Sequence, residues 1–193
     1  MRLDLHTGTF VDTGLRPNHD AVIGADRTLT WQALAQEAAA WCVQARAAGF
    51  AADVPVIIRG HKEAAFFVAI AGALMLGAPF VPLDTIYPDE RMGRIAHTLG
   101  AHAYYDARTA AFETLPHASS PQPLQEKGLA YVLFTSGTTG EPKGVMHSAN
   151  TLMANIVPYA ARLQLNQDDT ILMASPMAHQ TGFMYGLMMP VML

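Results

Sequence analysis

Residues 54–83 read VPVIIRGHKEAAFFVAIAGALMLGAPFVPL, and their pattern decides the fold class of this 193-residue chain. A short apolar run at 54–58 predicts a strand, and the Ala-rich stretch 62–76 predicts a helix that ends at Gly77. The run at 80–83 predicts a second strand. A strand, a helix and a strand at this spacing are typical of a βαβ unit, so we expect a parallel sheet.

The segments on either side continue the alternation. Helices are expected after Thr30 up to residue 48, at 89–99, after Ser148 up to residue 163, and at 179–189. Further strands are expected at 103–105, 131–134, 143–147 and 170–174. The fold class that follows is α/β, with mixed, largely parallel sheets flanked by helices.

Prolines and serines gather in one place that divides the chain. Three prolines and two serines fall between residues 116 and 125, which is typical of a linker. We therefore expect residues 1–115 to form a first α/β subdomain portion and residues 116–128 to form the linker. Residues 129–193 are expected to form a strand pair with following helices, incomplete at the carboxy end.

Charge and cysteine content exclude several classes of protein. The formal net charge is −4, with 12 Lys and Arg against 16 Asp and Glu, which argues against a nucleic-acid partner. The one cysteine, Cys42, excludes an internal disulfide and is expected to be a buried structural thiol. No Cys or His run has zinc-ligand spacing and no signal peptide is apparent, so we expect a cytoplasmic protein without a bound metal of its own.

Residues 170–193 contain no charged side chain, and this uncharged stretch is long enough to span a membrane. However, Pro176, His179, Gln180 and Pro190 interrupt the segment, and each of them is costly in hydrocarbon. A buried segment is therefore favoured over a span. We expect an oligomeric partner or a carboxy-terminal domain to cover residues 170–193.

Residues 135–144 read TSGTTGEPKG and combine four hydroxyl side chains, three glycines and Lys143. Glycines let backbone N–H groups converge on an anion, hydroxyls add neutral donors, and lysine adds a movable positive charge. Composition alone leaves a phosphate-binding loop and a plain strand connection equally open. The spacing Gly137-x-x-Gly140-x-x-Lys143 is neither a Walker A motif nor a dinucleotide fingerprint.

The order of residues in the unbroken run 134–144 resembles the signature of the adenylate-forming superfamily. This superfamily includes acyl-CoA synthetases, luciferases and the adenylation domains of peptide synthetases. Residues 77–91, GAPFVPLDTIYPDER, are similar to its upstream segment in amino-acid-activating members, and residues 175–183, SPMAHQTGF, to its Pro-x-x-His-x-x-Gly segment in acyl-CoA synthetases. The resemblance covers most of residues 28–193. It implies the fold of the amino-terminal portion of an adenylate-forming enzyme.

The resemblance also implies a reaction, its cofactors and its site residues. A carboxylate attacks the α-phosphorus of ATP, and the acyl group then passes to a thiol of coenzyme A or of a carrier-protein phosphopantetheine, with Mg²⁺ assisting. The residues that match the phosphate-binding positions are Thr135, Ser136, Gly137, Thr138, Thr139, Gly140 and Lys143. By the same matching, Lys143 tethers or releases the phosphates, and His179 lies beside the acyl pocket and ATP. Other family elements fall beyond residue 193, so we expect this chain alone to be inactive.

The substrate class stays open between two readings. Amino-acid-activating members generally place an Asp at or near the position of His179, and no acid follows Asp169, which favours a carboxylic acid without an amino group and an acyl-CoA ligase. The upstream segment that contains Asp84 favours amino-acid activation for a carrier protein instead. A non-catalytic nucleotide-binding fragment is the hypothesis from a different class. A serine hydrolase that uses Ser136 and His179 is disfavoured, because Gly-x-Ser-x-Gly is absent.

Overall fold

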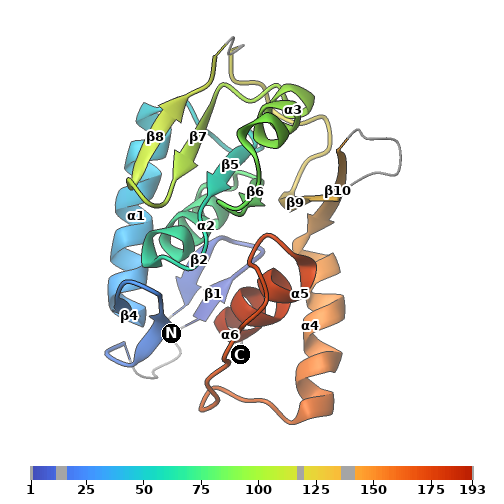
Figure 1. Cartoon of the computed structure of the whole chain (residues 1–193). Coiled ribbons are helices and arrows are strands. Elements are labelled where there is room, and N and C mark those ends of the chain that lie inside the picture. The colour runs from blue at the N-terminus through green and yellow to red at the C-terminus, as the bar shows by residue number, and fades with distance from the viewer. Residues whose placement is uncertain (1, 12–16, 117–119, 136–141, 193) are drawn as a thin grey trace.

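The computed structural model describes residues 2–11, 17–116, 120–135 and 142–192 (Figure 1). A six-stranded sheet lies at its centre, with strand order β10-β9-β6-β5-β7-β8. The inner strands are parallel, and they are β9 (Leu129–Thr135), β6 (Phe80–Leu83), β5 (Val56–Arg59) and β7 (Ala103–Asp106). The edge strands pair antiparallel to them, and they are β10 (Lys143–Ser148) and β8 (Ala111–Thr114).

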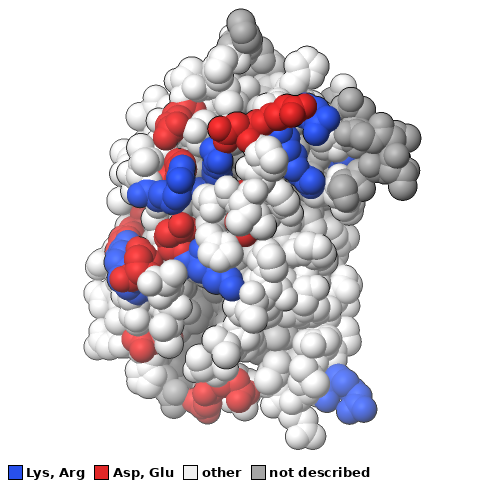
Figure 2. Space-filling view, in the orientation of Figure 1, with Lys and Arg blue, Asp and Glu red and all other residues white. Residues whose placement is uncertain are grey.

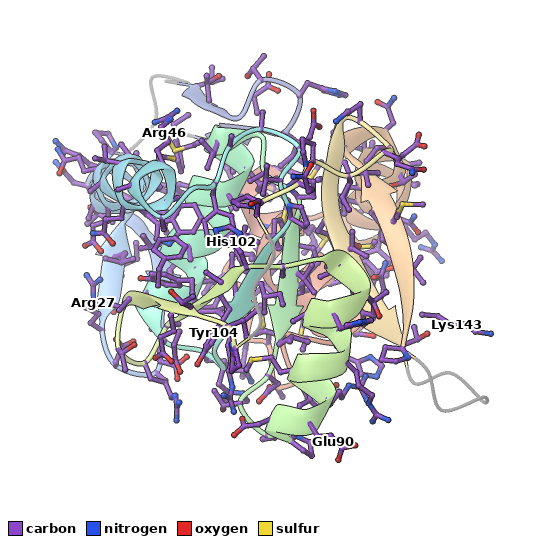
Figure 3. The ribbon with its side chains drawn as sticks, turned by 90° about the horizontal axis from the view of Figure 1, so that it is seen from above. Arg27, Arg46, Glu90, His102, Tyr104 and Lys143 are labelled. Carbon is purple, nitrogen blue, oxygen red and sulfur yellow. The ribbon has the colours of Figure 1, made fainter. Side chains whose placement is uncertain are left out.

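Helices cover both faces of this sheet. The helices α1 (Trp31–Ala47) and α2 (Ala64–Leu76) pack together on one face, and α3 (Asp89–Leu99) lies on the other. Figure 3 shows α1 and α3 on opposite sides of the strands. Neighbouring strand residues alternate between the two cores, since Ile58 packs on the α1 side and Ile57 on the α3 side. Both faces are buried, which is why the parallel strands have continuous apolar sequences.

The two ends of the chain lie on the same side of the molecule. Two small hairpins precede α1, formed by β1 (Arg2–Asp4) with β2 (Thr9–Val11) and by β3 (Asp20–Ile23) with β4 (Thr28–Thr30). After β10 come α4 (Ala149–Leu163), α5 (Gln180–Phe183), a π-helical turn (Met184–Met188) and α6 (Met189–Met192). Helix α6 contacts β1, so the last helix packs against the first strand (Figure 1).

The structure confirms the α/β class and most of the elements expected from the sequence. The βαβ unit is β5-α2-β6, and Gly77 ends α2 in the left-handed conformation with φ of 71°. Cys42 is buried, its Sγ donates to the Gly72 carbonyl oxygen at 3.1 Å, and burial raises the pKa of its thiol. The last helical stretch begins at Gln180, one residue later than expected, and includes a π-helical turn.

The strand expected at 170–174 is wrong. Among the described residues these five pair with no strand. The carbonyl oxygens of Met173 and Ala174 instead accept hydrogen bonds from Lys62 Nζ, at 2.9 and 3.0 Å. One side-chain ammonium group thus binds two successive carbonyl oxygens of this segment.

The segment 116–128 connects two parts of one sheet, because β9, which follows it, pairs with β6, which precedes it. The described part of the segment is tied to Asp53, which lies just before β5. The Asp53 carbonyl oxygen accepts from Leu124 N at 2.9 Å, and its Oδ1 accepts from Gly128 N at 3.2 Å. The division into two subdomain portions stays a prediction.

The chain itself buries much of the uncharged stretch 170–193. The side chains buried there include Phe183, Met184, Leu187, Met188 and Val191. Leu172, by contrast, is 94% exposed. Figure 2 shows few charged side chains over α4 and α5. No helix in the described part of the chain has both the length and the apolar character that crossing a membrane requires.

The amino terminus of α1 offers a test of the fold. Thr30 Oγ1 accepts a hydrogen bond from Ala33 N at 3.2 Å and so satisfies one of the first helical N–H groups. Replacing Thr30 by Ala is expected to lower the free energy of unfolding by about 1 kcal/mol, whereas Thr30→Ser keeps the acceptor and most of the stability. Urea unfolding curves give the unfolding free energies of both variants. Equal midpoints for Thr30→Ala and the parent would show that the cap contributes nothing.

Candidate functional site

The end of the β9–β10 hairpin holds two of the expected phosphate-binding residues. Thr135 ends β9, Lys143 begins β10, and the two are partners in the antiparallel register. The Thr135 hydroxyl donates to the Lys143 carbonyl oxygen at 3.5 Å, and both residues are exposed. Figure 3 shows the Lys143 side chain extending away from the sheet. A hydroxyl and an ammonium group therefore stand at one end of the hairpin. The ammonium can donate to an anion as it stands, whereas the hydroxyl must first leave the Lys143 carbonyl oxygen.

The remaining residues of the expected phosphate-binding run lie outside the described residues, and they are Ser136, Gly137, Thr138, Thr139 and Gly140. Their contacts with a triphosphate stay a prediction. The described flanks show only that the run begins and ends on two neighbouring strands, at positions that face each other.

Gly144, the third glycine of the run, has a packing role in β10. It faces Phe134 of β9 in the register. A Cβ atom at residue 144 would lie 2.8 Å from Val132 Cγ1 and 3.2 Å from Phe134 Cζ. Glycine thus lets β10 lie directly over these two side chains. Its presence in the run is explained by the sheet, without any contact to a ligand.

His179 stands at the start of α5 with its side chain exposed. Its N–H donates to the Pro176 carbonyl oxygen at 3.1 Å, and its own carbonyl oxygen accepts from Phe183 N at 2.9 Å. A Cβ atom on Gly182 would clash with the Pro176 carbonyl oxygen, so the turn and the helix fit closely only with glycine there. In the Pro-x-x-His-x-x-Gly pattern, Pro176 and Gly182 therefore shape a turn that presents the imidazole to solvent.

An aromatic cluster joins the hairpin to the His179 turn. Tyr131 of β9 stacks on His147 of β10, with ring centroids 4.5 Å apart and 6° between the ring planes. Its ring also contacts Phe183 at 4.5 Å, and its hydroxyl donates to Gln180 Oε1 at 3.1 Å. Burial raises the pKa of Tyr131, so this hydroxyl remains a neutral donor. Because Gln180 follows His179 directly, Tyr131 connects the two expected site segments.

His147 offers a pH test of this cluster. Burial lowers its pKa, so the folded protein keeps the ring neutral below about pH 6.5, where the unfolded chain binds a proton. The stability that the neutral ring contributes is present above that pH and is lost as the pH falls through the folded pKa. Replacing His147 by Phe is expected to reduce the acid-induced loss of stability between about pH 7.5 and about pH 5. Urea midpoints at both values test this, and equal losses in the two proteins would contradict it.

The carboxyl ends of β5, β6 and β9 lie at one edge of the sheet, because these strands are parallel. We call this the carboxyl edge. It is defined by three residues: His61 follows β5, Asp84 follows β6, and Thr135 ends β9. The chain leaves β5 for α2 on one face and leaves β6 for α3 on the other. In open α/β sheets, ligands bind in the crevice at such a switch point.

A buried carboxylate lies at this switch point. The Asp84 side chain is fully buried, with Oδ2 at 2.8 Å from His61 Nδ1 and Oδ1 accepting from Ile86 N at 3.1 Å. Asp84 therefore fixes the orientation of the His61 ring, which is 44% exposed. The pair presents an oriented imidazole at the carboxyl edge.

Further charged pairs surround this edge. Arg59 Nη2 lies 2.8 Å from Asp89 Oδ1. Burial alone would raise the pKa of Asp106, but hydrogen bonds from the Arg108 side chain and backbone lower it below its ordinary value. Figure 2 shows charges of both signs interspersed over this part of the surface. Opposite charges are paired here, so this surface is not a single-sign patch.

The sequence patterns assign no role to His61, Tyr131, His147 or Gln180. A usable signal exists for His61, because it follows a predicted parallel strand, as does Asp84. Polar residues directly after neighbouring parallel strands meet at one edge of a sheet. For Tyr131 and His147 the pairing of β9 with β10 is needed first, and for Gln180 the contact of α5 with Tyr131 is needed.

Comparisons with known proteins identify the family of the chain. The model of the family described as "AMP-binding enzyme" matches residues 12–115 and 104–193. A plipastatin synthase of Bacillus subtilis is 31% identical over 196 residues, which covers 91% of this chain and 5% of that protein. The antimetabolite synthetase AmbB of Pseudomonas aeruginosa is 35% identical over 146 residues, which covers 67% of this chain and 12% of that protein. The chain thus spans only a small part of these relatives.

Solved structures share the fold. The o-succinylbenzoate CoA synthetase of Bacillus subtilis, in complex with its acyl-adenylate intermediate, aligns with a TM-score of 0.75 at 22% identity, covering 92% of this chain and 51% of that chain. A four-domain nonribosomal peptide synthetase bound to AMP and glycine aligns with a TM-score of 0.72 at 22% identity, covering 91% of this chain and 14% of that chain. Since the family model matches nearly the whole sequence, the chain belongs to the AMP-binding enzyme family and corresponds to the amino-terminal portion of its adenylate-forming members.

Proposed function

We propose that the complete protein uses ATP to activate an amino acid as its adenylate and then passes the activated acid to the thiol of a carrier protein. The observation that carries the adenylation step is the hairpin end where Thr135 and Lys143 face each other, within the run that resembles the adenylate-forming signature. The choice of an amino acid is supported by relatives such as plipastatin synthase and by the solved peptide synthetase that holds AMP and glycine.

The chemistry explains why cations and donors are needed. A carboxylate oxygen bonds to the α-phosphorus of ATP, and the bond from that phosphorus to the pyrophosphate oxygen breaks, which gives the adenylate and pyrophosphate. Both reactants are anions, so the site must stabilise negative charge on the phosphates. We propose that the exposed Lys143 ammonium donates to the β- and γ-phosphates, and that the Thr135 hydroxyl does so after it leaves the Lys143 carbonyl oxygen. In the second step a thiolate sulfur attacks the acyl carbonyl carbon, and AMP leaves.

Among the described residues, no group of three or more His, Cys, Asp or Glu side chains is arranged to hold a metal ion. We propose that Mg²⁺, which would neutralise phosphate charge, takes its ligands outside the described residues. The donor set of the hairpin end fits ATP, and its role does not depend on the metal ligands.

The test is ATP–pyrophosphate exchange by the complete protein with a panel of amino acids and of acids that lack an amino group. Exchange with one amino acid, followed by loading of a phosphopantetheinylated carrier protein, is the expected result. If the protein binds nucleotide but catalyses pyrophosphate exchange with none of the acids, the proposed enzymatic activity is overturned and a nucleotide-binding role is favoured.

Transfer to coenzyme A is the second candidate. It is favoured by the segment that places Pro176, His179 and Gly182 in one turn, and by the absence of any acid after Asp169. A substrate ammonium group would find no carboxylate partner in residues 170–193. Exchange with an acid that lacks an amino group, and formation of its coenzyme A thioester, would establish this reading over the first.

A further inference from the structure

We propose that Lys62 is a positioning residue, which holds the turn that carries His179 and thereby sets the binding of the carboxylic acid substrate. The catalytic consequence rests on the proposed function. The positioning itself is a property of the fold and can be measured without substrate.

The backbone at Lys62 is fixed on both sides at the carboxyl edge. The Lys62 carbonyl oxygen accepts from Ala25 N at 2.8 Å. The His61 N–H donates to Glu63 Oε2 at 2.7 Å, and the Ala64 N–H donates to Asp26 Oδ1 at 2.8 Å. Lys62 therefore projects from a rigid connection between β5 and α2.

From this base the ammonium group reaches a distant segment. Lys62 Nζ donates to the carbonyl oxygens of Met173 and Ala174, at 2.9 and 3.0 Å. The segment 170–174 has no strand partner among the described residues, and Leu172 within it is 94% exposed. Hydrogen bonds from a charged donor are stronger than neutral ones. Lys62 thus anchors the segment through two successive carbonyl oxygens.

The anchored segment fits closely against the following helix. A Cβ atom on Gly186 would clash with the Met173 side chain, and one on Gly182 would clash with the Pro176 carbonyl oxygen. The turn is closed by the hydrogen bond from His179 N to the Pro176 carbonyl oxygen. A shift of Met173 would therefore disturb its contact with the π-helical turn at Gly186, which follows His179 in the chain.

His179 lies between two anchors that face different parts of the site. Lys62 holds the amino side of the turn. Tyr131 holds the carboxyl side through its hydrogen bond to Gln180, and it belongs to the β9–β10 hairpin, in which Lys143 begins β10. Loss of the Lys62 anchor leaves the hairpin contact intact. The resemblance implies that His179 lies beside both the acyl pocket and ATP. Because ATP also keeps its proposed contacts with the hairpin, we expect the larger effect on the acid.

The experiment replaces Lys62 by Met in the complete protein, which keeps the apolar stem and removes the donors. Backbone amides of residues 173–183 are expected to exchange hydrogen about tenfold faster. The KM for the acid in pyrophosphate exchange is expected to rise about tenfold, and the KM for ATP to stay within about twofold. Lys62→Arg, which keeps a charged donor, is expected to restore most of both properties. Lys127→Met is the matched control, because Lys127 is exposed and pairs only loosely with Asp53, at 3.7 Å.

Unchanged hydrogen exchange in residues 173–183 overturns the positioning role. Equal rises in the KM for acid and for ATP overturn its selectivity. If the parent enzyme activates no acid, the proposed function fails, and hydrogen exchange alone still decides whether Lys62 holds the turn. If Lys62→Met does not fold, Lys62→Gln takes its place, because the uncharged amide keeps two N–H donors and is expected to give an intermediate increase in exchange.

Discussion

Replacing Lys143 by Ala in the complete protein is expected to slow ATP–pyrophosphate exchange by about a hundredfold or more and to leave the unfolding midpoint unchanged. The side chain is exposed, and the β10 pairing with Thr135 uses only the backbone of Lys143. Stability therefore does not depend on the ammonium group. A donor aimed at developing charge is worth about 10²–10³ in rate. Exchange rates at saturating ATP and acid, with urea midpoints, measure the two effects.

Two further variants separate charge from position. Lys143→Arg keeps the positive charge but changes its shape, so an intermediate rate is expected. Lys127→Ala removes another exposed ammonium, one that lies 3.7 Å from Asp53, and is expected to exchange at the parent rate. If Lys143→Ala exchanges as fast as Lys127→Ala, Lys143 does not contact the phosphates.

The hairpin shows how far sequence reasoning reaches in this protein. The strands expected at 131–134 and 143–147 are present as Leu129–Thr135 and Lys143–Ser148. Apolar runs and breakers are local signals, and they place such elements well. The pairing of Thr135 with Lys143 and the stacking of Tyr131 on His147 depend on register, which the composition of each strand does not specify.

The segment 170–174 shows where local reasoning fails. Its apolar, β-branched residues are typical of a strand, but a strand also needs a neighbour that donates to its carbonyl groups. Here the donor is the side chain of Lys62, which precedes Met173 by 111 residues. Nothing in the sequence around Lys62 indicates that its side chain will bind the backbone at Met173.

The buried pair of His61 and Asp84 illustrates a similar limit. Asp84 is 1% exposed, although an isolated Asp in a loop sequence is normally expected at the surface. Its burial follows from the adjacency of β5 and β6, which brings the His61 ring to 2.8 Å. The sequence predicts both strands, and the parallel pairing then accounts for the contact.

Replacing Phe183 by Ala is expected to lower the free energy of unfolding by about 3–5 kcal/mol, which is the usual cost of deleting a fully buried Phe ring. Phe183 is 0% exposed. Its ring centroid lies 5.2 Å from that of Phe80 and 4.5 Å from that of Tyr131, so the deletion leaves a cavity between α5 and the sheet. The loss of unfolding free energy is measured by urea unfolding of the complete protein, monitored with a spectroscopic probe placed in this portion of the chain.

Phe67 provides the matched control, because it is an aromatic residue of α2 that is only half-buried. Phe67→Ala removes the same ring from a site that water partly reaches, so it is expected to cost less than Phe183→Ala. Equal costs would mean that α5 is not packed into the core as firmly as its burial indicates. The consequence would reach the site, since the Phe183 N–H donates to the His179 carbonyl oxygen, and a loosely packed Phe183 would leave the imidazole without a fixed position.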